Sequence, residues 1–103
     1  VPYVKEQIDN NYRRLDPNAD FGLAVLPSSY IERHFHFGFI TDAFGIDQRH
    51  RIGVERMLWS SDYPHINSSW PESQKSIEEH FRGVPADEKR KMVAENAANL
   101  YGL

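Results

Sequence analysis

The sequence contains no cysteine and no long hydrophobic run. Without cysteine, its 103 residues can form neither a disulfide scaffold nor a thiolate metal site, and they offer no cysteine nucleophile. No apolar stretch approaches the roughly 20 residues that span a bilayer, and the first residues lack the charged and apolar regions of a signal peptide. We therefore expect a cytoplasmic protein that does not enter a membrane.

Positive charge is also scarce. Twelve Lys and Arg residues stand against 15 Asp and Glu residues, so the formal net charge is −3. The basic residues form no block long enough to follow a phosphate backbone, and the triplet Lys89, Arg90 and Lys91 is typical of an exposed helix face. We expect no nucleic-acid partner. The hydrophobic share of 40% and the charged share of 26% are those of a folded globular protein.

Several segments have the spacing of helices. Apolar residues predict a first helix over about residues 2–15, and the turn-forming segment DPNADFG follows it. PSSYIERH has a short helical start at Pro27, and TDAFGIDQRHRIG is expected to hold a short helix between turns. A capping box of Ser69 and Glu72 predicts a helix from there to about residue 81. A last helix ends at Gly102, and its expected core face carries Met92, Val93, Ala97, Leu100 and Tyr101.

Two segments have the alternation of β-strands. HFHFGF places His34, His36 and Gly38 on one face, and RMLWSSD places Leu58, Ser60 and Asp62 on one face. A connection of about 15 residues with a helix predicts that the strands are parallel. Two parallel strands cannot bury both faces of a sheet with so little chain. We therefore expect residues 1–103 to be a single α/β segment, without internal boundary, of a larger domain.

Asp62 is the strongest candidate for chemistry. It ends the second predicted strand, and functional groups in parallel α/β folds and (β/α)8 barrels gather at the carboxyl ends of strands. A carboxylate at this place can bind a divalent cation and accept a proton from metal-bound water. The alternative is an Asp that only caps the turn before Tyr63 and Pro64. Spacing alone does not separate the two interpretations.

The last 47 residues, MLWSSDYPHINSSWPESQKSIEEHFRGVPADEKRKMVAENAANLYGL, resemble a known family. They are similar to the C-terminal end of the amidohydrolase-related metal-dependent hydrolases and decarboxylases. The likeness lies in the Ser-Asp-Tyr-Pro-His close of the last strand, the Trp-Pro helix start and the Glu-Asn-Ala-Ala-x-Leu-Tyr-Gly helix. VPYVKEQIDNNYRRL resembles the helix after the sixth strand, and PSSYIERHFHFGF resembles the seventh strand and its approach. The resemblance implies the last two strands and flanking helices of a (β/α)8 TIM-like barrel.

The resemblance also implies a function. It indicates a metal-dependent hydrolase or nonoxidative decarboxylase that acts on a small organic substrate, with Asp62 as metal ligand and proton acceptor. The expected cofactor is a divalent ion of the zinc or manganese class. The family's H-x-H pair and middle-strand histidines have no counterpart here, so we expect the isolated 103 residues to be inactive and to hold no complete metal site. The remainder of the barrel, or another copy of the chain, would cover the sheet.

Three more residues are candidates for the substrate pocket. His65 could contact substrate or orient the Asp62 carboxylate, Trp70 could form a wall, and His36 could line the lower pocket. Each also has a structural interpretation, as a loop histidine, a packed helix start or a hydrogen-bonded strand residue. Two alternatives to the enzyme stay open. One is a metal site built on His34 and His36, and the other is a non-catalytic module that binds a partner or itself.

Overall fold

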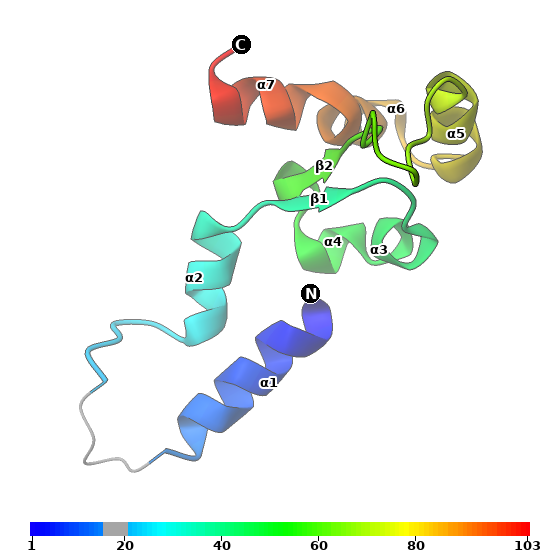
Figure 1. The fold of residues 1–103 in the computed structure, drawn as a ribbon. Helices are drawn as coiled ribbons and strands as arrows, with labels where there is room; N and C mark the ends of the chain where they lie inside the picture. Colours follow the sequence, from blue (N-terminus) through cyan, green and yellow to red (C-terminus); the bar gives the residue numbers. More distant parts are fainter. Residues whose placement is uncertain (16–20) are drawn as a thin grey trace. The chain divides into compact units, whose positions relative to one another are not determined.

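The computed structural model describes residues 1–15 and 21–103, so most of the predicted turn segment DPNADFG lies outside the described residues. The chain forms two compact units, residues 1–35 and 36–103, whose elements are labelled in Figure 1. Within the described ranges, no helix has the length and apolarity that a membrane crossing requires.

The first unit is a pair of helices, α1 (Pro2–Arg13) and α2 (Pro27–His34). Asp9 of α1 accepts hydrogen bonds from the Ser28 hydroxyl at 2.7 Å and from its backbone N–H at 2.9 Å. These bonds lower the pKa of Asp9 because they stabilise the ionised carboxylate. An ion pair between Lys5 and Glu32, at 2.6 Å, also joins the helices. The predicted first helix is confirmed, and α2 is longer than the short helical start expected at Pro27.

The strand predicted over HFHFGF is mostly wrong. Helix α2 continues to His34, and only Phe37–Phe39 form the strand β1. Pro27 begins the helix in its first turn, where the missing N–H costs nothing, and the ring of Tyr30 stacks on His34 at a centroid distance of 6.3 Å. His34 and His36 therefore do not share a strand face, and the geometry expected for a two-histidine metal site is absent.

The second unit contains a two-stranded parallel sheet, as predicted. β1 pairs with β2 (Met57–Trp59) so that Phe37 lies opposite Met57 and Phe39 opposite Trp59. The crossover between the strands contains the short helices α3 (Ala43–Asp47) and α4 (Arg49–Ile52) and a 3-10 turn, η1 (Val54–Arg56). β2 is shorter than expected, because it ends at Trp59 and not at Asp62.

Helices follow β2 to the end of the chain. They are α5 (Ser73–His80), α6 (Ala86–Arg90), a π-helical turn η2 (Lys91–Glu95) and α7 (Asn96–Tyr101), which ends at Gly102 with a φ of 72°. The predicted capping box is wrong. The N–H of Ser69 donates to the Ser61 carbonyl at 3.0 Å, which keeps Ser69 in the preceding loop, and the helix begins four residues later.

The core of the second unit lies where the strands meet the C-terminal helices. Met57 of β2 and Met92 of η2 are its largest fully buried side chains, and Trp59 packs against the same cluster. The core positions predicted at Leu100 and Tyr101 are wrong, since these side chains are 43% and 70% exposed. The π-helical turn inserts an extra residue, so α7 is rotated relative to an uninterrupted α-helix.

Asn96 is the buried polar residue of this core, with only 6% of its surface exposed. Its side-chain amide donates to the carbonyl of Val54 at 2.7 Å and to the carbonyl of Met57 at 2.9 Å. One side chain on α7 thus satisfies two backbone acceptors at the point where the chain enters β2. This contact fixes the C-terminal helix to the start of the strand.

We predict that Asn96→Ala lowers the free energy of unfolding by about 2 to 4 kcal/mol, because two buried carbonyls lose their donor. Asn99→Ala, on the exposed part of the same helix, should change it by less than about 0.5 kcal/mol. Urea unfolding of both variants measures the difference. Equal stability of the two variants would contradict the structural role of Asn96.

Candidate functional site

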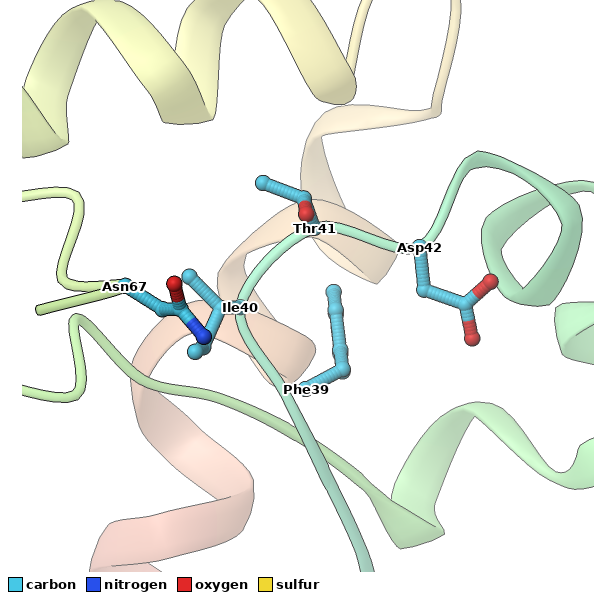
Figure 2. Close-up of a pocket in the computed structure, with 5 residues that line it drawn as sticks. All are labelled: Phe39, Ile40, Thr41, Asp42 and Asn67. Carbon is cyan, nitrogen blue, oxygen red and sulfur yellow. The ribbon is translucent and has the colours of Figure 1, made fainter.

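The carboxyl ends of β1 and β2 lie at the same edge of the sheet because the strands are parallel. A pocket of about 500 Å³ opens there, within the size range of ligand sites. It is lined by residues from the end of β1 and the turn that follows, together with one residue from the loop after β2: Phe39, Ile40, Thr41, Asp42 and Asn67. Figure 2 shows the Asn67 amide pointing toward Ile40, so the two loops meet at this pocket.

Asp62 lies three residues beyond β2, in the loop at this edge. Its φ of 57° is in the left-handed region, which Asp tolerates better than most residues. The residue is half-buried. Its backbone carbonyl accepts from the N–H of His65 at 2.8 Å, whereas no hydrogen bond or ion pair of its carboxylate is found within residues 1–15 and 21–103. The turn is therefore held by a backbone hydrogen bond and not by the Asp62 carboxylate.

Serines close the loop that holds Asp62. The Ser69 N–H reaches the Ser61 carbonyl at 3.0 Å across the neck of the loop, and the Ser61 hydroxyl accepts from the N–H of Tyr63 at 3.4 Å. At the other side, the Ser68 hydroxyl accepts from the N–H of Trp70 at 3.1 Å. These local bonds hold the loop between β2 and α5 closed on itself.

An aromatic pair stands on this loop. The rings of Tyr63 and Trp70 are 5.8 Å apart and inclined by 69°, an edge-to-face contact, and both side chains are mostly exposed. His65 is also exposed, between them in sequence. The structure thus places Asp62, His65 and Trp70 in one loop.

His36 lies elsewhere. It immediately precedes β1, at the amino edge of the sheet, and its Nε2 lies 3.3 Å from Nη1 of Arg56. It lines a second cavity that shares no residue with the pocket at the carboxyl edge. The structure therefore does not bring His36 together with Asp62.

None of the five pocket residues was predicted as a site residue from the sequence, and none of the four predicted residues lines the pocket. Three of the five are polar: Thr41, Asp42 and Asn67. Asp42 also caps α3, since its carboxylate accepts from the N–H of Gly45 at 2.7 Å. The sequence did hold a signal for Thr41 and Asp42. They follow the predicted FGF strand closely, and residues that follow a parallel strand emerge at the carboxyl edge of the sheet, where ligands bind. Asn67 had no comparable signal, since its place depends on the closure of the serine-bonded loop.

The side chains present do not by themselves fit a metal ion. Across the part of the chain that the structure describes, no group of three or more His, Cys, Asp and Glu residues is arranged to hold one. A protein zinc site normally takes three or four such ligands. Asp62 alone is therefore insufficient.

The structure thus has an α/β fold with two parallel strands, and the loop after the second strand carries the carboxylate of Asp62. Comparison with known proteins then identifies the family. The family model described as Amidohydrolase matches residues 34–103, which is more than half of the chain. The chain belongs to this amidohydrolase family, as its C-terminal resemblance predicted, and the family generally uses divalent metal ions. A search of curated proteins found no match.

We predict that Asp62→Asn changes the free energy of unfolding by less than about 0.5 kcal/mol, because the carboxylate has no structural bond to lose. Asp62→Val should cost about 1 to 2 kcal/mol, since a β-branched residue is strained at this positive φ. Asp42→Ala, which removes a helix cap, should cost about 1 kcal/mol. Urea unfolding compares the three, and a loss for Asp62→Asn as large as that for Asp42→Ala would contradict a free carboxylate.

Proposed function

We propose that these residues form the last two strands and flanking helices of a (β/α)8 barrel in a metal-dependent hydrolase or nonoxidative decarboxylase. The family match supports the enzyme class. The parallel pairing supports the barrel, because a sheet of two parallel strands needs further strands and helices to cover it. The isolated 103 residues have no turnover in this proposal, since the site is assembled from several strands.

The carboxylate of Asp62 is the observation that carries the proposal. Asp62 is half-buried and stands in the loop that also supplies Asn67 to the pocket, and its carboxylate has no hydrogen-bond or ion-pair partner among the described residues. Removing a carboxylate partly from water is costly unless a cation or donors compensate it. We assign Asp62 as one ligand of a divalent ion and as proton acceptor. The other ligands must come from polypeptide outside these residues.

The remaining residues of this edge are assigned to the substrate. Asn67 and Thr41 offer an amide and a hydroxyl that can orient polar groups of a small organic molecule. Trp70, with Tyr63 against its ring, can form an apolar wall. His65 follows Asp62 closely enough in sequence to contact substrate or to orient the carboxylate. These groups suit either hydrolysis or decarboxylation of a small substrate.

We predict that Asp62→Asn weakens divalent metal binding by the natural polypeptide by about tenfold or more, because even the partners that orient metal ligands are worth 10- to 100-fold in affinity. Metal titration and the metal content of the purified protein measure the effect. Asp47→Asn, an exposed carboxylate at the end of α3, serves as the matched control and should bind metal as the natural protein does.

Unchanged metal affinity of the Asp62→Asn variant would contradict the assignment. A loss shared equally by Asp47→Asn would also contradict it, because the effect would then follow net charge and not position.

Exposed apolar side chains support a further part of the proposal, which concerns partners. Large apolar residues of both units are exposed, among them Phe44, Ile66 and Trp70. In the barrel, the rest of the polypeptide covers such surface, and in the isolated segment a second copy covers it. The second candidate function rests on the same exposed surface. It is a non-catalytic module whose activity is to bind a partner or another copy of itself.

We predict that the isolated 103-residue chain sediments as a self-associated species, because exposed apolar surface favours contact between copies. Ile66→Lys should reduce the association, since Ile66 is fully exposed at 101% and makes no core contact. Analytical ultracentrifugation measures both. A compact monomer of 12.0 kDa would contradict the expectation.

A further inference from the structure

A second cavity, of about 420 Å³, lies at the amino edge of the sheet. Its lining comes from the residue before β1, from η1 and from the C-terminal helix: His36, Glu55, Arg56, Asn96, Asn99 and Leu100. It is distinct from the pocket proposed for substrate, because the two share no residue and belong to opposite ends of the strands. Its volume falls in the range of small-molecule sites.

Arg56 is the cation of this cavity. Its guanidinium has five donors, and Nη1 approaches Nε2 of His36 at 3.3 Å. Since an arginine can only donate, His36 accepts at this nitrogen. Within the described ranges, no carboxylate forms an ion pair with Arg56, although the residue is half-buried. A partly desolvated guanidinium with unused donors is suited to a planar oxyanion, which it can bind through two parallel hydrogen bonds.

Glu55 does not take that role. Its carboxylate accepts from the ammonium of Lys91 at 3.0 Å, and this bond lowers the pKa of Glu55, which therefore stays ionised. The charge of Arg56 also lowers the pKa of Glu55, so the two groups attract each other although they form no ion pair. The Glu55 carboxylate is engaged by Lys91, whereas the guanidinium of Arg56 keeps donors available in the cavity. An anionic ligand is thus favoured over a cationic one.

The other walls indicate an organic ligand. Leu100 is 43% exposed and offers an apolar surface beside the polar groups. Asn99 offers an amide, and the neighbouring Asn96 is held rigidly by its two bonds to backbone carbonyls. The π-helical turn η2 directly precedes these residues, and such turns are frequent at functional sites.

We propose that this cavity binds a small organic carboxylate, with Arg56 holding the carboxylate group and Leu100 packing against the apolar part. His36 and Asn99 contact polar substituents of the ligand. The site does not depend on the function proposed for Asp62, because it uses none of the same residues.

Isothermal titration calorimetry of the natural polypeptide with hexanoate tests the proposal. We expect saturable binding in the millimolar range or tighter, and binding of the uncharged analogue hexanamide that is weaker by about tenfold or more. Arg56→Gln should weaken hexanoate binding by a similar factor. Arg82→Gln removes the same charge in the exposed turn after α5, away from the cavity lining, and should leave the affinity unchanged.

A second pair of variants tests hexanoate binding even if the Arg56→Gln variant does not fold. Leu100→Glu places a negative charge in the cavity on a partly exposed helix position and should abolish hexanoate binding. Tyr101→Glu places it one residue further along, at a side chain that does not line the cavity, and should have little effect. Absence of hexanoate binding, equal effects of the two glutamates, or inorganic phosphate binding as tightly as hexanoate would overturn the proposal.

Discussion

The parallel pairing of β1 with β2 determines where each functional group of the second unit lies. Because both strands run in the same direction, Asp42, Asn67 and Asp62 follow the carboxyl ends, while His36 and Arg56 precede the amino ends. Two cavities with different chemistry result. One is built from loops with amide, hydroxyl and carboxylate groups, and the other is built from a cation and its imidazole neighbour.

Asn96 maintains this arrangement from the C-terminal helix. Its amide bonds to the carbonyls of Val54 and Met57 hold the turn that leads into β2. Met92, one turn earlier, is buried against the strand, so apolar packing and the polar contact act on the same few residues. Asn96 also lines the amino-edge cavity. The stability of the second unit and the shape of that cavity therefore depend on the same side chain.

Patterns that reflect local chemistry were predicted well from the sequence. The first helix, the parallel sheet and the end of the last helix at Gly102 follow from periodicity, crossover length and glycine conformation. The resemblance of residues 57–103 identified the family, which the family match confirms. The position of Asp62 at the carboxyl side of the second strand also followed from the sequence, although it lies in the loop and not in the strand.

The errors arise where a simple periodic pattern or a short motif does not determine the structure. Alternation alone predicted a strand through His34, but the helix begun at Pro27 includes that residue. The Ser69 capping box failed because the Ser69 N–H is bound to Ser61 across the loop. The exposure of Leu100 and Tyr101 follows a π-helical turn, which a period of 3.6 residues does not anticipate. Asn67 and Arg56 became site candidates only when folding placed them beside distant residues.

We propose above all that the Asp62 carboxylate is a ligand of a metal ion at the carboxyl edge of the sheet. A crystal structure of the metal-loaded natural polypeptide tests it most directly. We expect a carboxylate oxygen of Asp62 about 2.0 to 2.2 Å from the ion, with the other ligands contributed by polypeptide outside residues 1–103. An ion bound without Asp62, or an Asp62 carboxylate bonded only to neighbouring residues of its own loop, would contradict it.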